Sequence, residues 1–351
     1  MKITSIHPSI ATRIANALRG GTTSLRKDTD LKQHSYHDSG SVLGRQIFLF
    51  ILRKEVKITG IQIARLNRIH QLSNKPVTSP QSGAVVSVTS YGKRLRTVHL
   101  TLESIAAGSV LPSRLILWVD TEEAFANPSK ELKRLIERGL ELRLSENLGP
   151  HTKYYPYLLE TESFACPLVT ADDDQLYPNW WLEGLLRSYQ QDPASVSCYR
   201  AHRVEMANDA MAPYESWKPC RSIMPSCLHF ATGVSGVLYP PFFLKHLKAA
   251  GREFLNLCPK QDDAWLHVQA LRAGMPIRQI YNRPLRFPAI PGSQSGGLFH
   301  TNVLLAQNDR GICLTYGSSD LAVLRACATS ALHMFSSAPA NTAQSRMRRT
   351  L

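Results

Sequence analysis

The chain has 351 residues, 43% of them hydrophobic, and a formal net charge of +14. This length and apolar content can bury one large core or two smaller ones, which excludes a fibrous or wholly disordered protein. The charge is uneven: residues 1–83 contain 13 Lys and Arg against 4 Asp and Glu, and residues 340–351 contain three Arg and no acid. Residues 84–339 are therefore nearly neutral, and the high pI alone does not indicate a nucleic-acid-binding protein.

The N-terminal region divides into two parts. Residues 1–40 are rich in Ser, Thr, His and Gly without a period, which predicts a mobile basic tail. In residues 41–83, apolar residues near helical spacing alternate with basic ones and lead into a Ser- and Pro-containing linker. This amphipathic segment either attaches to an anionic membrane surface or packs on the main domain with a solvated basic face, which is the commoner case.

Cysteine usage and targeting signals bear on the compartment. The seven cysteines form no C-x-x-C pair, and their odd number favours free thiols in a reducing cytosol. No apolar run approaches the roughly 20 residues that span a bilayer, and the N-terminus lacks a secretory signal. The first 27 residues contain Arg and Ser but no acidic residue, as organelle transit peptides do. Many bacterial N-termini have the same composition. We expect a cytoplasmic protein that can touch the inner face of the membrane.

After residue 83, predicted strands and helices alternate. β-branched and apolar runs predict strands at 84–90, 114–120, 140–146 and 166–171, and helical patterns ended by Gly lie at 97–108 and 129–139. This order implies right-handed crossovers and an α/β fold with a mostly parallel sheet, covered by helices on both faces. Ligands of such sheets bind beyond the carboxyl ends of the strands.

Three carboxylates, Asp172, Asp173 and Asp174, directly follow the last of these strands. If the backbone stays extended, Asp172 and Asp174 point to one side and Asp173 to the other. Mg²⁺ and Mn²⁺ take oxygen ligands and are commonly held by one or two carboxylates plus substrate phosphates. The D-x-D pattern therefore favours a Mn²⁺ or Mg²⁺ site. The alternative is a solvated acidic turn before the helix from Asn179, whose dipole also favours carboxylates.

The order of these motifs resembles that of nucleotide-sugar glycosyltransferases of the GT-A fold, closest to glycosyltransferase family 2 and the capsular-polysaccharide-type enzymes near it. The resemblance covers about residues 84–291 and rests on VVSVTSYGKR, Asp120, ADDD, TGVSGVLYP at 232–240 and QDDAWLHVQALRAGMPI at 261–277. It implies a Rossmann-like GT-A domain at 84–311, preceded by the tail and the amphipathic segment. A C-terminal helix and basic tail at 312–351 follow it.

The resemblance also implies roles for the matched residues. The nucleoside pocket is lined by Thr89, Ser90 and Tyr91, and Asp120 accepts hydrogen bonds from the base or ribose. Asp172 lies near the ribose and the metal, and Asp174 ligates the metal. The third acid, Asp173, leaves open which pair of carboxylates binds it. Asp263, with Asp262 as the competing choice, is the general base that deprotonates the acceptor hydroxyl.

Other candidate residues have two interpretations each. Lys153 reaches the diphosphate or is an ordinary surface lysine, and His300 is a third metal ligand or a plain exposed or satisfied histidine. Gly233 and Gly236 allow close approach to the donor sugar or belong to a simple turn. Trp181 keeps core spacing, whereas Trp180 is either a platform for a sugar or without function.

Together these features predict a metal-dependent transferase for polysaccharide biosynthesis, and the resemblance makes it inverting. It would move a sugar from a nucleoside diphosphate sugar, with UDP as the expected nucleotide, to a hydroxyl on a glycan or lipid-linked acceptor. One alternative is a sugar nucleotidyltransferase, for which TSYGKRLRT at 89–97 is a poor phosphate-binding loop. The other is a nucleic-acid-binding protein, against which the nearly neutral segment 84–339 argues.

Overall fold

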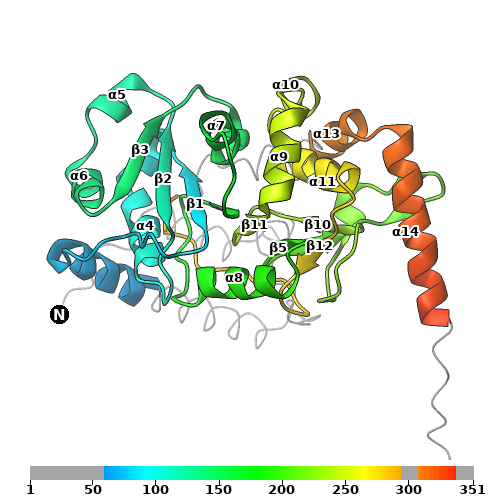
Figure 1. Ribbon diagram of the computed structural model, residues 1–351, viewed down its shortest axis with the longest axis horizontal. Helices are drawn as coiled ribbons and strands as arrows, with labels where there is room; N and C mark the ends of the chain where they lie inside the picture. The colour runs from blue at the N-terminus through cyan, green and yellow to red at the C-terminus, as the bar shows by residue number, and fades with distance from the viewer. Residues whose placement is uncertain (1–58, 294–306, 337–351) are drawn as a thin grey trace, which may run out of the picture.

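The computed structural model describes residues 59–293 and 307–336, which are built around a seven-stranded sheet (Figure 1). The strand order is β12-β5-β11-β4-β1-β2-β3, and every neighbouring pair is parallel except the two that β11 forms. The predicted α/β class with a mostly parallel sheet is confirmed. The strands are β1 (Val85–Thr89), β2 (Arg114–Val119), β3 (Leu140–Leu144), β4 (Leu168–Ala171), β5 (Val196–Cys198), β11 (Val237–Tyr239) and β12 (Ile277–Gln279).

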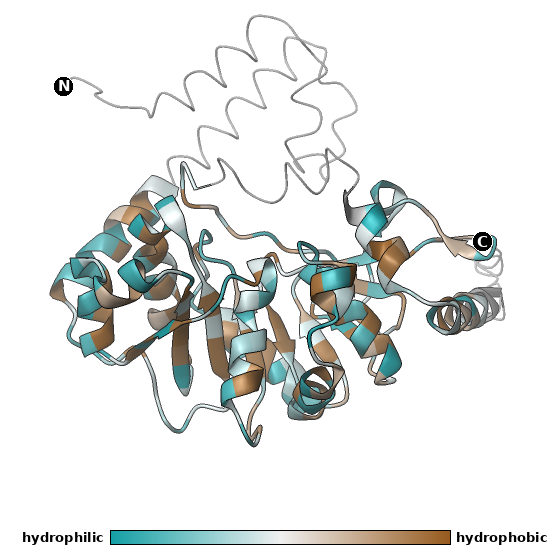
Figure 2. Cartoon of the chain, turned by 90° about the horizontal axis from the view of Figure 1, so that it is seen from above, coloured by the Kyte–Doolittle hydropathy of each residue, from teal (hydrophilic) through white to brown (hydrophobic). Residues whose placement is uncertain are grey.

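Helices cover both faces of the sheet. Val86 and Leu117 face one core with α4 (Val98–Ala106), α6 (Lys130–Glu137) and α8 (Trp181–Gln191). Trp118 faces the other core with α7 (Tyr155–Glu160), α9 (Pro241–Ala250) and α11 (Asp262–Arg272). Figure 2 shows hydrophobic strands between helices with hydrophilic outer surfaces. Because both faces are covered, β1 and β2 are almost continuously buried runs.

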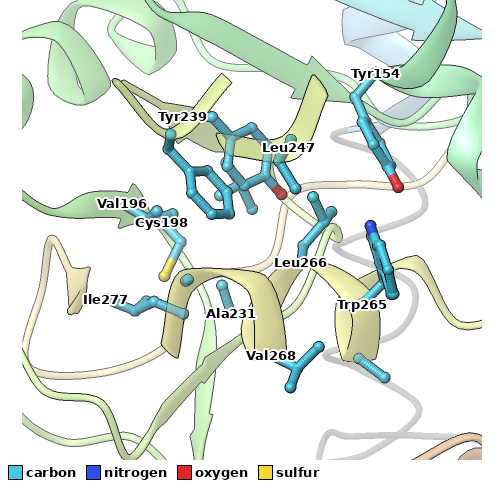
Figure 3. Packing of buried hydrophobic residues seen from close by; sticks show 14 of the residues in the cluster. Tyr154, Val196, Cys198, Ala231, Tyr239, Leu247, Trp265, Leu266, Val268 and Ile277 are labelled. Carbon is cyan, nitrogen blue, oxygen red and sulfur yellow. The ribbon is translucent and has the colours of Figure 1, made fainter. Parts of the chain in front are cut away.

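The second core holds α11 against the C-terminal half of the sheet. Trp265, Leu266 and Val268 of α11 belong to one buried cluster with Val196 of β5 and Tyr239 of β11, and Figure 3 shows how the side chains of this cluster surround α11. All five side chains are at most 6% exposed, so the start of α11 is fixed relative to the strand ends.

Shorter elements complete the fold. They are α5 (Glu122–Ala126), α10 (Phe254–Leu257), α13 (Gln307–Thr315), α14 (Ser318–Ser336), and the 3-10 helices η2 (Gly92–Arg96), η3 (Gly149–Lys153) and η4 (Tyr214–Ser216). A small sheet has the order β10-β6-β9, and β7 pairs with β8. Their bounds are β6 (Ala201–Arg203), β7 (Met206–Ala207), β8 (Ala210–Met211), β9 (Lys218–Pro219) and β10 (His229–Ala231).

Residues 59–72 form a helix that packs against α4. Its Leu66 is buried with Leu100, and His70 Nδ1 lies 2.7 Å from a carboxylate oxygen of the buried Glu103. Residues 1–58 lie outside the described residues, as does the basic tail from 337. Within residues 59–293 and 307–336, no helix has both the length and the apolar character that a membrane crossing requires.

The cysteines differ from the expectation of seven free thiols. Cys227 and Cys327 form a disulfide, and five thiols remain free. The expectation was wrong for this pair because its members are 100 residues apart, with no local motif to mark them. The free thiols are Cys166, Cys198, Cys220, Cys258 and Cys313.

Candidate functional site

The carboxyl ends of β1, β2 and β4 bring residues from distant parts of the sequence to one edge. The register pairs Val88 with Ala171 and Thr89 with Trp118, so Ser90, Asp120 and the acidic triplet all follow aligned strand ends. This edge is where open parallel sheets bind ligands. It is therefore the candidate functional site.

Asp173 is held by the segment that follows β1. Ser90 Oγ donates to its Oδ2 at 2.6 Å, and Arg94 Nη1 donates to its Oδ1 at 2.7 Å. Thr101 Oγ1 donates to its backbone carbonyl at 3.0 Å. Burial nevertheless raises the pKa of Asp173, against the opposing effect of Arg94. Both oxygens of this carboxylate are thus engaged by the protein.

Asp174 shares Arg94 with Asp173, because Arg94 Nη2 lies 3.1 Å from Asp174 Oδ2. The expected alternation of side chains assumed an extended backbone through 174, but the strand ends at Ala171 and a turn includes 173 and 174. Burial, and next the charge of Asp172, raise the pKa of Asp174 to about 7. The nearby Arg94 only partly offsets these two effects.

Lys153 extends from the end of η3 to the centre of the site. Its Nζ lies 2.6 Å from Asp172 Oδ1 and 3.8 Å from Asp262 Oδ2. Burial alone would lower the pKa of Lys153, but the carboxylates, Asp172 first, raise it well above its ordinary value. With a side chain only 14% exposed, Lys153 is not a surface lysine, and its contact with a diphosphate stays a prediction.

Asp262 and Asp263 open α11 on the other side of Lys153. Gly233 N donates to Asp263 Oδ1 at 2.8 Å. Burial, and next the charge of Asp262, raise the pKa of Asp263 to about 8. A Cβ at Gly233 would lie 3.3 Å from both Asp263 Oδ1 and Lys153 Nζ, so glycine there lets the loop 232–236 approach both charged groups closely.

Gly236, at the end of the same loop, faces the protein interior. It has φ +96°, and a Cβ there would lie 2.6 Å from the ring of the buried Trp181. Trp181 Nε1 donates to Ser235 O at 2.8 Å, so this tryptophan fixes the loop from its interior side. The neighbouring Trp180 is 38% exposed and its ring lies 5.7 Å from that of Tyr199.

The other predicted residues flank this centre. Thr89 is partly buried, Tyr91 is 47% exposed, and Asp120 Oδ2 accepts from Asn147 Nδ2 at 2.8 Å. His300 lies outside the described residues.

Sequence reasoning missed Arg94 and Gln175. A buried carboxylate requires a partner, so three consecutive acids do signal nearby basic residues, but not which ones. Gln175 Nε2 lies 3.4 Å from Asp172 Oδ2, and its Oε1 is buried without a hydrogen-bond partner among the described residues. The only signal for Gln175 was its position directly after the triplet.

The donor set suits a divalent cation whose remaining ligands come from a substrate. No three His, Cys, Asp or Glu side chains form a metal site within the described part of the chain. Mg²⁺, however, is commonly held by one or two carboxylates plus substrate phosphates and waters, rather than by an all-protein cage. Asp172 and Asp174 can supply the carboxylates, and the unpartnered Oε1 of Gln175 is a further oxygen beside them.

No protein-family model and no curated protein matches the chain. Similar solved structures include a CMP:2-keto-3-deoxy-manno-octonic acid synthetase complexed with CTP, with 15% identity over 65% of this chain and 100% of that chain, at a TM-score of 0.37. The mannosyltransferase PcManGT from Pyrobaculum calidifontis, in complex with GDP-Man and Mn²⁺, has 12% identity over 81% and 86%, at a TM-score of 0.40. TarS 1–349 from S. aureus has 13% identity over 71% and 72%, at a TM-score of 0.41.

Proposed function

We propose that the protein is a glycosyltransferase that moves a sugar from a nucleoside diphosphate sugar to an acceptor hydroxyl. The observation that carries this proposal is the pair of carboxylate groups, Asp172–Asp174 and Asp262–Asp263, on either side of Lys153. Glycosyl transfer has two requirements, since a departing diphosphate must be stabilised and one proton must be accepted. Two acidic groups with different partners match these two requirements.

The donor occupies the carboxyl ends of β1, β2 and β4. The nucleoside lies by Thr89, Ser90 and Tyr91, with Asp120 as the acceptor for hydrogen bonds from the base or ribose. The positions of these residues at one sheet edge support this assignment. UDP is the nucleotide that we propose.

Asp172 and Asp174 would hold Mn²⁺ or Mg²⁺, with Gln175 Oε1 as a further oxygen ligand and His300 retained as a candidate. When bound, the metal supplies a Lewis acid for the negative charge of the diphosphate. The excess of acidic over basic groups supports this, since burial and neighbouring acids raise the pKa values of Asp174 and Asp263.

Asp263 is the proposed general base, with Asp262 as the competing choice. The Gly233 N–H fixes Asp263 Oδ1, which leaves Oδ2 for the acceptor. The acceptor oxygen forms a bond to the anomeric carbon while the bond to the diphosphate breaks, and its proton passes to the carboxylate. Attack opposite the leaving group inverts the anomeric centre. The pKa of Asp263, raised to about 8, makes its deprotonated form a stronger proton acceptor than an ordinary carboxylate.

A thermal-shift experiment tests the proposal. The protein is heated with UDP, GDP or CDP, each with Mn²⁺, with Mg²⁺ or with excess chelator, because a ligand that binds only the folded state raises the melting temperature. UDP should stabilise the protein only with metal. Equal stabilisation in chelator would remove the metal role, and no response to any nucleotide would contradict the function. Release of UDP from a UDP-sugar distinguishes this activity from that of a nucleotidyltransferase, which releases pyrophosphate from a nucleoside triphosphate.

The acceptor is a glycan or a lipid-linked sugar at the cytoplasmic face of an anionic membrane. The excess of 13 Lys and Arg over 4 Asp and Glu in residues 1–83 supports this location, because basic segments are attracted to anionic lipid. Co-sedimentation with phosphatidylserine vesicles at low and high salt tests it. Binding that is absent at low salt contradicts it.

A further inference from the structure

The backbone of Lys153 is held in place by contacts on both sides of the residue. Ser87 Oγ on β1 donates to Lys153 O at 2.6 Å, and Trp118 Nε1 on β2 donates to the same Ser87 oxygen at 2.9 Å. Two residues earlier, His151 Nε2 bonds Cys258 O at 2.9 Å and its ring stacks on Phe254. The residue is therefore anchored to the sheet and to α10, and only its four-carbon side chain can move.

The ammonium group of Lys153 lies where the two acidic groups meet. It is in ion-pair contact with Asp172 Oδ1, while Asp262 Oδ2 is 3.8 Å away. A Cβ added to Gly233 would be only 3.3 Å from it, so one wall of this space is bare backbone. A small displacement of Nζ can thus exchange one carboxylate for the other without rearranging the main chain.

Lys153 and a metal ion compete for Asp172. Both are cations that would use the Asp172 carboxylate, and two positive charges beside one carboxylate repel each other strongly in a partly buried site. Arg94 differs from Lys153, because its planar guanidinium contacts Asp173 and Asp174 together. A lysine, as a compact charge on a flexible stem, is the better suited of the two to leave its partner.

We infer that Lys153 is an exchangeable counter-cation: it neutralises Asp172 in the empty site, leaves it to the divalent metal, and then binds the diphosphate of the donor. This inference rests on the proposed function. It explains why the lysine that contacts Asp172 also lies beside Asp262. From one fixed backbone position, Lys153 can neutralise a carboxylate in the empty site and bind the diphosphate in the loaded site.

The experiment compares the full-length protein with Lys153→Met, and Lys153→Arg serves as the charge-preserving control. Binding of Mn²⁺ alone is followed by electron paramagnetic resonance of the free ion, and UDP binding at saturating Mn²⁺ by calorimetry. Lys153→Met should bind Mn²⁺ at least about tenfold more tightly and UDP at least about tenfold more weakly. Lys153→Arg should change each affinity less than Lys153→Met does.

Opposite shifts in the two affinities are the signature of exchange. Weaker UDP binding with unchanged Mn²⁺ affinity would make Lys153 an ordinary phosphate ligand and overturn the inference, as would unchanged values for both. If Lys153→Met does not fold, Lys153→Gln replaces it, since an amide can still donate to Asp172. Wild-type protein that binds Mn²⁺ but no nucleotide contradicts the proposed function. Wild-type protein that binds no Mn²⁺ contradicts the exchange itself.

Discussion

Two buried groups of charges in this molecule are compensated in different ways. Glu103 on α4 is fully buried and is contacted by Arg138 through both terminal nitrogens and by His70, so its one carboxylate has one permanent cation. At the sheet edge, five carboxyl groups, Asp172–Asp174, Asp262 and Asp263, meet Arg94 and Lys153. A third basic residue, Arg200, donates to Thr232 Oγ1 at 2.8 Å and lies near enough to Asp263 for their charges to interact.

The difference separates a structural group from the group that we propose to be functional. The matched group around Glu103 joins the helix 59–72 to α4 and to the end of α6, and it leaves nothing for a ligand to neutralise. In the unmatched group at the edge, burial first and neighbouring carboxylates next raise the pKa values of Asp174 and Asp263, and such raised values are common at functional sites. Both groups are buried, so they differ in the number of carboxylates for each cation.

The largest expected effect is on chemistry at the unmatched group. Asp263→Asn should lower sugar transfer by a factor on the order of 10² to 10⁴ and leave metal-dependent UDP binding nearly intact. The amide oxygen can still accept from Gly233 N, but it cannot take a proton at neutral pH. Steady-state turnover and UDP calorimetry on the same preparation measure both effects.

Asp262→Asn is the matched control, because the residue is adjacent and its carboxylate also faces Lys153. If Asp263→Asn keeps near-normal turnover and Asp262→Asn loses it, the two roles are reversed.

Asp174→Ala should lose UDP affinity and turnover together, because it removes a contact present in both ground and transition states.

At the matched group the effect should be on stability. Glu103→Gln should lower the free energy of unfolding by about 3–5 kcal/mol, since it leaves the buried Arg138 without its partner. Glu141→Gln is the control: Glu141 pairs with Arg114 at 2.7 Å, but both are partly exposed, and the cost should be below about 1 kcal/mol. Urea unfolding measures both. Equal costs would show that burial of the Glu103 pair is energetically unimportant.

The N-terminal half of the fold could be predicted from the sequence because its strands are long enough to show a pattern. β1 to β4 and the helices α4 and α6 are continuous apolar or amphipathic runs ended by glycine or by acidic residues. The strands β5 to β12 contain only two or three residues each, which is too few for any period. Their pairing, including the antiparallel β11, depends on tertiary packing.

The carboxylates of the candidate site could be predicted from the sequence and their partners could not, for a related reason. Strand ends mark the carboxylates, so Asp172–Asp174 could be placed from local pattern alone. Their partners come from distant segments: Arg94 is 79 residues from Asp173, and Ser87, which holds Lys153, is 66 residues from it. Side-chain pairing over such separations depends on the packed fold and cannot be inferred from the local pattern of one sequence.

A smaller effect on stability is expected in the loop 232–236, whose Gly233 N donates to Asp263. Gly236→Ala should cost about 2–4 kcal/mol, since a Cβ would meet the Trp181 ring at 2.6 Å and φ is +96°. Gly251→Ala is the control, because φ there is +68° but nothing lies within 4 Å of the added Cβ. Thermal unfolding of both variants isolates the steric part of the cost. A Gly236→Ala protein as stable as Gly251→Ala would show that Trp181 moves freely.

His267 provides a third way of burying a titratable group, which is to keep it neutral. Its Nε2 donates to Cys227 O at 3.0 Å and its Nδ1 lies 2.5 Å from the Tyr316 hydroxyl. Burial lowers the pKa of His267 to about 4, against about 6.5 in an unfolded chain. Between these values the unfolded state binds more protons, so the stabilisation is complete above pH 6.5 and is lost as the pH falls toward 4.

The expected size of this last effect is about 2–3 kcal/mol between pH 7 and pH 4, as the shift in pKa implies. Urea unfolding at pH 7, 5.5 and 4.5 should show a steeper loss for the wild type than for His267→Gln, which cannot bind the proton. Burial also lowers the pKa values of His151 to about 4 and of His202 to about 3, so part of the slope should remain in His267→Gln. Parallel slopes for the wild type and His267→Gln would mean that His267 gains a proton in the folded protein without cost. His267 would then resemble the matched group at Glu103, because the fold would accommodate its charge at a buried position.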